Sequence, residues 1–239
     1  MFKTKTAKGA GTQARILDAA LRLFRTNGFE QTTVRDIAEA AGLSLGAAYH
    51  YFPGKDAIVL AYYAQVHDEH ARRTTAAFGA GGRLRERLGA AFHAKFDILA
   101  DDRPLMGALL RYTGDPTHPL SFLGPRTRGL QLCSIGVFAE AVAAERLSAD
   151  LRVLTPLTLW ALHMGLLLYF LYDDSPHQKR TRRLTDGALD LFVRALTLAR
   201  LPLLRPVTRS VARLLDEAGL LPDEAGIEQA RIDAMAEEE

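Results

Sequence analysis

The chain has 239 residues, of which 48% are hydrophobic, so it can bury a substantial core, and this composition excludes a globally disordered protein. Its formal net charge of +2 conceals a basic front and an acidic end: residues 1–56 carry eight Lys or Arg against five Asp or Glu, whereas residues 216–239 carry nine acids and one Arg. The single cysteine, Cys133, excludes an intrachain disulfide and a cysteine-based zinc site within one chain, and it fits a reducing cytoplasm.

The first expected elements are a basic, glycine-rich arm over residues 1–11 and a helix that Thr12 caps and Asn27 ends. Thr33 and Asp36 have the spacing of a capping box, which predicts that a second, short helix begins after Thr33. Apolar residues recur at helical spacing through both segments, so their inner faces are expected to pack together.

A third short helix is predicted after a tight turn. Gly42 suits the position just past the second helix, where the backbone is left-handed and glycine has no steric cost. Ser44 then caps a helix that runs to about His50, and Pro53 follows it.

The remaining chain keeps helical periodicity and shows no run of alternating β-branched residues and no internal repeat, which predicts an all-α fold. Helices are expected over residues 55–77, 83–100, 104–112, 126–145, 150–172, 184–201 and 207–218. Residues 113–125 and 175–183 are expected to be loops. The most apolar run, 157–172, is shorter than the roughly 20 residues of a membrane span and contains His163, so we expect a buried helix and no membrane association.

The sequence GLSLG at residues 42–46 permits two interpretations. As G-x-S-x-G it matches the nucleophile elbow of a hydrolase, but that turn needs a buried strand before the serine. The preceding TVRDIAEAA has polar residues at helical spacing, so the enzyme interpretation fails on context. Two short helices joined by a tight glycine-containing turn instead indicate a helix-turn-helix, whose second helix enters the major groove of DNA. Three helices that merely pack together remain the alternative.

The stretch ILDAALRLFRTNGFEQTTVRDIAEAAGLSLGAAYHYFPGKDAI resembles the N-terminal domain of TetR-family transcriptional regulators. The resemblance covers about residues 12–60, and its pattern departs from the family's in two places, Ala48 and Pro53. It implies an N-terminal three-helix helix-turn-helix DNA-binding domain joined to a larger helical ligand-binding and dimerisation domain. We therefore expect the arm and DNA-binding domain at residues 1–56, the regulatory domain at 57–221 and an acidic tail at 222–239.

The resemblance also implies a ligand-responsive repressor that binds double-stranded DNA at a palindromic operator as a homodimer and is released by a small-molecule effector. The last two long helices, about 150–172 and 184–201, would form the dimer interface, and the first of these is apolar on more than one face. The basic cluster between Lys179 and Arg183 is expected to be a solvated loop or helix start rather than a second DNA-binding patch. We expect no catalytic residues, no cofactor and no metal.

The candidate DNA-binding residues divide between phosphate contact and base contact. Those expected on phosphates are Thr33, Tyr49, His50 and Lys55. Those expected at base edges are Ser44, Leu45, Gly46 and Ala47.

The candidate ligand-binding residues are mostly aromatic, and each is also a plausible core residue because aromatic side chains at helical spacing mostly pack. They are Phe92, Phe96, Tyr112, Phe122, Trp160, His163 and Met164. Such a lining favours a hydrophobic or aromatic effector.

Weaker signals leave two rival functions. An effector-free dimeric DNA-binding regulator would share every feature of the N-terminal segment, whereas a helical enzyme would need His163 or His93 beside an acid, and no spacing supports it. His67 and His70 are spaced as metal ligands on a helix, but the charged residues around them favour a solvated face. GAGTQA at residues 9–14 lacks the preceding strand of a dinucleotide-binding motif.

Overall fold

The protein is described here from a computed structural model, which describes residues 7–115, 117–122, 124–221 and 226. Among these residues none lies in a strand, and the elements are helices joined by short connections, so the all-α prediction is confirmed. The chain divides into two compact units, one formed by residues 1–66 and 101–127 and the other by residues 67–100 and 128–239. Helix α4, Lys55–Gly79, contributes its first half to one unit and its second half to the other.

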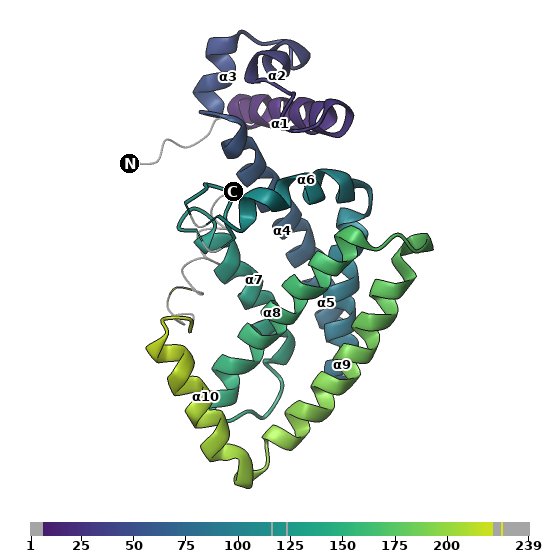
Figure 1. Cartoon of the computed structure of the whole chain (residues 1–239), viewed down its shortest axis with the longest axis vertical. Coiled ribbons are helices and arrows are strands. Elements are labelled where there is room, and N and C mark those ends of the chain that lie inside the picture. The colour runs from purple at the N-terminus through teal and green to yellow at the C-terminus, as the bar shows by residue number, and fades with distance from the viewer. Residues whose placement is uncertain (1–6, 116, 123, 222–225, 227–239) are drawn as a thin grey trace. The chain divides into compact units, whose positions relative to one another are not determined.

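The first unit contains the predicted three-helix segment. Its elements are α1 (Ala7–Asn27), α2 (Val34–Ala40), α3 (Leu45–Tyr51), the beginning of α4, and α6 (Arg103–Thr113). Helix α2 packs against both α1 and α3, and α6 packs against α1 (Figure 1). The core between them is built from fully buried apolar side chains, among them Ile16, Phe24, Ile37, Ala48 and Ile58. The apolar spacing read from the sequence therefore produces one continuous core.

The second unit is a larger helical bundle. Its helices are α5 (Leu84–Leu99), α7 (Arg128–Val142), α8 (Ala149–Tyr172), α9 (Lys179–Ala199) and α10 (Arg205–Glu217), together with the second half of α4. Helix α8 runs beside α7, α9 runs beside α5, and α10 packs on α8 (Figure 1). Its most deeply buried side chains include Leu88, Phe92, Phe96, Phe138 and Phe170.

The N-terminal prediction requires a correction. Helix α1 begins at Ala7, so residues 7–11 continue the helix, although they were expected to belong to a flexible arm. Thr12 lies inside the helix and does not cap it. Gly9 and Gly11 each disfavour helix by about 1 kcal/mol relative to alanine, so local propensity does not account for this extension. The rest of the predicted arm, residues 1–6, lies outside the described residues.

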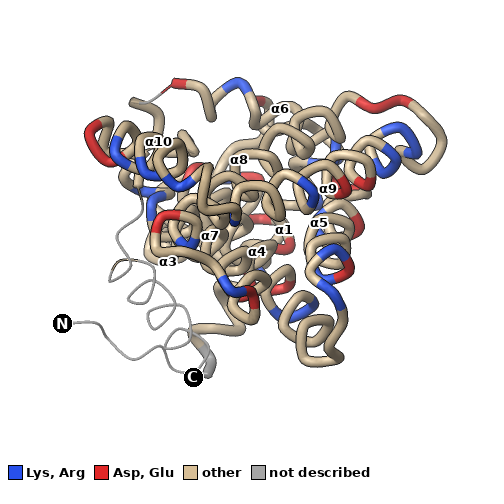
Figure 2. The backbone as a smooth tube through the Cα atoms, turned by 90° about the horizontal axis from the view of Figure 1, so that it is seen from below, with Lys and Arg blue, Asp and Glu red and all other residues tan. Residues whose placement is uncertain are grey.

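Two later boundaries also differ from the prediction. Helix α9 begins at Lys179, five residues before the expected start, because Asp173 receives hydrogen bonds from the backbone N–H of Thr181, at 2.8 Å, and from its hydroxyl, at 2.7 Å. The basic run 179–183 is therefore the first turn and a half of a helix (Figure 2). Of the two expected alternatives, a solvated loop and a helix start, the second is confirmed. Helix α7 ends at Val142, three residues before the expected end. Apart from Gly226, the acidic tail at 222–239 lies outside the described residues.

Candidate nucleic-acid interface and ligand chamber

The second helix is fixed at its start by reciprocal side-chain and backbone bonds. The N–H of Asp36 donates to the Thr33 hydroxyl at 3.2 Å, and the N–H of Thr33 donates to the Asp36 carboxylate at 2.8 Å. These bonds from Thr33 hold the pKa of Asp36 below its ordinary value, since they favour the charged carboxylate. The predicted capping box is confirmed.

The turn between α2 and α3 depends on one left-handed residue. Gly42 has φ +66°, and the next N–H, that of Leu43, reaches back to the carbonyl oxygen of Ala38 at 2.9 Å. A side chain at position 42 would be strained in this conformation. Arg15 of α1 supports the turn, because its guanidinium donates to the carbonyl oxygen of Ala41 at 3.2 Å.

Helix α3 begins directly after this turn. The Ser44 hydroxyl accepts from the N–H of Ala47 at 3.2 Å, so the predicted cap is present. Ala48 is completely buried and anchors the helix, while Tyr49 is 49% exposed and His50 is exposed. Tyr49 is therefore not a core residue. The helix keeps its N-terminal turn and its aromatic side chains available to a partner.

The other candidate DNA-binding residues lie around the same helix. Thr33, Ser44 and Gly46 are exposed, and Leu45 and Ala47 are half-buried. Lys55 is already engaged: its ammonium donates to the carbonyl oxygens of Phe29, at 2.7 Å, and Glu30, at 3.2 Å, and lies 4.5 Å from the centre of the Phe29 ring. A phosphate contact by Lys55 would have to compete with these partners, and all eight assignments stay predictions.

A carboxylate behind the three-helix segment joins three elements of the first unit. Asp102, just before α6, accepts from Arg25 of α1 and from the hydroxyl of Tyr62 in α4 at 2.5 Å. Burial raises the pKa of Asp102, but the hydrogen bonds from Arg25 and Tyr62 and the charge of Arg25 outweigh it and hold the pKa below its ordinary value. Burial, with the bond to this carboxylate, raises the pKa of Tyr62.

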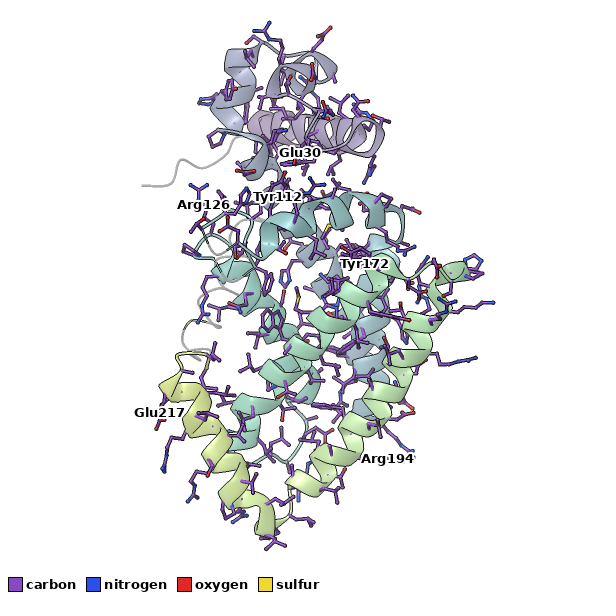
Figure 3. The ribbon with its side chains drawn as sticks, viewed as in Figure 1. Glu30, Tyr112, Arg126, Tyr172, Arg194 and Glu217 are labelled. Atoms are coloured by element: carbon purple, nitrogen blue, oxygen red, sulfur yellow. The ribbon has the colours of Figure 1, made fainter. Side chains whose placement is uncertain are left out.

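A second connection lies between the α1–α2 loop and α6. The Tyr112 hydroxyl donates to the Glu30 carboxylate, and Figure 3 shows these two side chains directed toward one another. The Tyr112 ring also meets the Phe29 ring edge-on, with centroids 5.7 Å apart, and stacks on His118 at 4.6 Å. Sequence reasoning missed both connections, because no local spacing pairs Arg25 with Asp102 or Glu30 with Tyr112.

The predicted ligand-binding residues fall into both units. In the second unit, Phe92, Phe96 and His163 form one aromatic cluster with Phe138, in which the His163 ring centre lies 5.1 Å from that of Phe92 and 5.5 Å from that of Phe138. Trp160 and Met164 are half-buried on α8 beside His163. The other two candidates, Tyr112 and Phe122, belong to the first unit, and Phe122 is 36% exposed. We call the first cluster, Phe92, Phe96, Phe138 and His163, the aromatic chamber; its four side chains pack against one another and are at most 4% exposed.

The expectation for the α4 histidines was wrong. His67 and His70 were expected on a solvated face, but they are 7% and 1% exposed, while their neighbour Asp68 is exposed. The two histidines share one side of α4, and that side faces the bundle interior. Within the described residues no cluster of three or more His, Cys, Asp or Glu side chains is arranged to hold a metal ion.

Burial keeps these imidazoles neutral. Desolvation lowers the pKa of His67 to about 4 and that of His163 to about 3, and the nearby Lys95 ammonium lowers both further. The same causes lower the pKa of His70, and burial lowers that of Lys95 to about 7. The three imidazoles are therefore neutral at pH 7, and Lys95, with a pKa of about 7, is the titratable group among these four that keeps part of its charge there.

Helix α8 leaves much of its apolar surface uncovered. It contains a stretch of 18 residues with mean hydropathy 1.6, long and apolar enough to cross a bilayer by length and composition, of which 39% is buried. Its exposed large side chains are Leu168, Tyr169 and Tyr172, and α9 exposes Leu184, Leu191 and Leu198. Tyr169 lines a groove of about 930 Å³ together with residues of α9, among them Leu184 and Leu191. Basic side chains, including Arg183 and Arg194, line the groove.

Comparison with known families covers both parts of the chain. Residues 16–62 match the family described as "Bacterial regulatory proteins, tetR family", and residues 87–214, just over half of the chain, match "Tetracyclin repressor-like, C-terminal domain". The first match contains the whole turn between α2 and α3, and the second contains the aromatic chamber.

Several curated proteins are similar over the N-terminal part. The chain is 44% identical over 54 residues to the HTH-type transcriptional repressor KstR2 of Rhodococcus jostii, covering 23% of this chain and 26% of that protein. It is 42% identical over 70 residues to the regulator TtgR of Pseudomonas putida (29% and 33% covered) and 30% identical over 107 residues to the regulator BetI of Paraburkholderia phymatum (44% and 55% covered). The chain thus spans only a quarter to about half of the length of these relatives.

Solved structures extend the likeness of the fold to most of the chain. A TetR transcriptional regulator from Nitrosomonas europaea superposes with a TM-score of 0.60 at 20% identity, covering 75% of this chain and 96% of that one. The FadR repressor of Thermus thermophilus, solved in complex with lauroyl-CoA, superposes with a TM-score of 0.55 at 24% identity, covering 79% and 95%.

Proposed function

Because this chain belongs to the TetR family of transcriptional regulators, we propose that it is a ligand-responsive repressor that binds a palindromic DNA operator as a homodimer in the cytoplasm. The observation that carries the proposal is the capped helix α3, which follows a left-handed glycine turn and leaves Tyr49 and His50 exposed. In a helix-turn-helix, this helix lies in the major groove with its first residues at the base edges.

The proposed contacts follow from exposure. Ser44, Leu45, Gly46 and Ala47 lie in the first turn of α3, where two small side chains allow the backbone to approach the bases closely. Thr33, Tyr49, His50 and Lys55 surround that turn and would contact phosphates, which supply most of the affinity and make binding salt-dependent.

Substitution of Tyr49 tests this assignment. We expect Tyr49→Ala to weaken binding to the operator by about tenfold, the size of one lost phosphate or base contact of about 1.4 kcal/mol, without changing thermal stability, because the side chain is half exposed and outside the core. Fluorescence anisotropy with a labelled operator measures the affinity. Leu203→Ala, which removes an 85% exposed apolar side chain outside the proposed dimer surface, is the control, and undiminished binding by the Tyr49→Ala protein contradicts the assignment.

A second copy of the chain is the proposed cover for α8 and α9. Leu184, Leu191 and Leu198 recur every seven residues, so they form one stripe along α9, and they are 48%, 67% and 58% exposed. Together with the exposed side chains Leu168, Tyr169 and Tyr172 of α8, this stripe is an exposed apolar surface of the kind that marks a protein–protein interface. Pairing with the same surface of a second copy buries both helices in a two-fold symmetric bundle.

The proposed effector would bind the aromatic chamber of the second unit. Its lining is apolar with few polar groups, as in sites for hydrophobic ligands, and a regulator with the same fold was solved with lauroyl-CoA. An effector that binds one spacing of the two DNA-binding segments more tightly would shift the dimer away from the operator. A screen for compounds that raise the melting temperature distinguishes this repressor from an effector-free regulator.

A further inference from the structure

Three buried imidazole nitrogens in the second unit have no hydrogen-bond partner within the described part of the chain: Nδ1 of His93, Nδ1 of His70 and Nε2 of His163. The last two belong to neighbouring side chains on α4 and α8, which are 1% and 4% exposed. Their rings are parallel to within 2°, with centroids 5.8 Å apart. Buried polar atoms of this kind are rare, and each needs an explanation.

The hydrogen bond of His70 determines which type of group is missing. Its Nε2 lies 2.8 Å from the carbonyl oxygen of Ala91, and a carbonyl oxygen only accepts, so Nε2 carries the proton. The neutral ring then presents a bare lone pair at Nδ1, which requires a donor. His163 is also neutral, so its Nε2 either donates or accepts.

The side chains around the two nitrogens indicate what kind of molecule could supply the missing group. Phe92, Phe138 and Phe96 surround the His163 ring, with centroids 5.1, 5.5 and 6.5 Å away. The two nitrogens are therefore polar positions on an aromatic wall. A hydroxyl has one proton, so it can donate to Nδ1 of His70 and accept from Nε2 of His163 when that nitrogen carries the proton, whereas a carboxylate has no proton to donate.

We propose that His70 and His163 anchor the uncharged hydroxyl of an apolar or aromatic effector, such as a phenol or an alcohol. This inference rests on the proposed ligand response and names the chemical class of its ligand. On binding, the ligand hydroxyl exchanges its hydrogen bonds to water for hydrogen bonds to both histidines. The apolar part of the ligand displaces the phenylalanine rings or packs against them. An isosteric hydrocarbon leaves both nitrogens unpaired and therefore binds more weakly.

Matched probes test the proposal. We would measure the binding of 2-naphthol, naphthalene and 2-naphthoate by calorimetry to the wild type, to His163→Phe, and to Met164→Leu as a volume-conserving control on the same helix. At pH 8.5, above the pKa of Lys95 of about 7, the wild type and the control should bind 2-naphthol at least tenfold more tightly than naphthalene and more tightly than 2-naphthoate. In His163→Phe the preference for naphthol over naphthalene should fall several-fold, because the hydroxyl keeps only its bond to His70.

The ligand-free stability provides a second readout. Phe at position 163 removes an unpaired nitrogen from an aromatic cluster, so we expect the melting temperature of His163→Phe to rise above that of the wild type; His163→Leu serves if Phe does not fit. The proposal is overturned if the wild type does not prefer 2-naphthol or if His163→Phe keeps that preference. It is also overturned if the melting temperature falls in both variants, because that result shows that an ordered water or core contact already satisfies the His163 ring. Operator binding without ligand is recorded for every protein, and its absence in the wild type would refute the proposed function instead.

Discussion

Asp102 accepts both hydrogen bonds of the Arg25 guanidinium fork, at 2.6 Å from Nε and 3.0 Å from Nη2, although the residues lie 77 positions apart. The pair joins the end of α1 to the start of α6, and Tyr62 of α4 binds the same carboxylate. The helix-turn-helix segment is thereby attached to two other helices of its unit through one side chain.

Loss of the Asp102 charge should weaken this attachment. We expect Asp102→Asn to lower the free energy of unfolding by about 2 kcal/mol at pH 7, which is within the usual range for hydrogen bonds to a charged group. The loss should be smaller than that of a fully buried ion pair, because the Arg25 side chain is 44% exposed. Urea unfolding measures the change. Asp101→Asn, at the exposed neighbouring residue, is the control, and equal stabilities for both variants would contradict the prediction.

The capping box should contribute to the stability of the DNA-binding segment. Thr33→Ala removes the hydroxyl that accepts from the Asp36 N–H, and we expect a loss of about 1 kcal/mol. Thr33→Ser keeps the hydroxyl and should stay near the wild type. Chemical denaturation followed by circular dichroism measures both, and a Ser variant as unstable as the Ala variant would show that the methyl group, not the cap, matters.

The α9 stripe should determine the oligomeric state. Leu191→Glu places a charge at the most exposed leucine of the stripe, which a dimer interface would have to desolvate, so we expect the dimer to dissociate at micromolar concentration. Light scattering during size-exclusion chromatography measures the mass. Leu203→Glu changes a leucine that is 85% exposed outside the stripe and should leave the mass unchanged. A Leu191→Glu protein that remains dimeric would refute the proposed interface.

The neutral histidines predict a stability that falls with decreasing pH. The folded-state pKa of His163, about 3, is lower than its unfolded value near 6.5, so the unfolded chain binds the extra proton and stability is lost as the pH falls from 6.5 toward 3. Each such imidazole contributes a slope of up to about 1.4 kcal/mol per pH unit, and His67, with a pKa of about 4, adds to it. Urea unfolding at pH 7.5, 6 and 5 measures the slope. His163→Phe should make it shallower, and an unchanged slope would show that this ring is not the source.

The sequence by itself determined the helices and the turn of the DNA-binding segment. The capping box at Thr33, the left-handed Gly42 and the Ser44 cap each depend on bonds between residues three to five positions apart, and local spacing encodes such bonds. The same periodicity predicted most later helices, and it failed at the start of α9, where Asp173 reaches eight residues forward to Thr181.

Only the tertiary structure decided which side chains meet across the chain. Arg25 and Asp102, Glu30 and Tyr112, and His70 and His163 are each brought together by the packing of separate helices, and one sequence contains no signal that pairs them. The tertiary structure also decided which face of α4 is buried. The charged residues around His67 and His70 suggested that this face is exposed to solvent, but a helix packed among others buries one side whatever the charge of its opposite side. Bonds between near neighbours are readable from spacing, whereas contacts between distant segments depend on how whole helices pack.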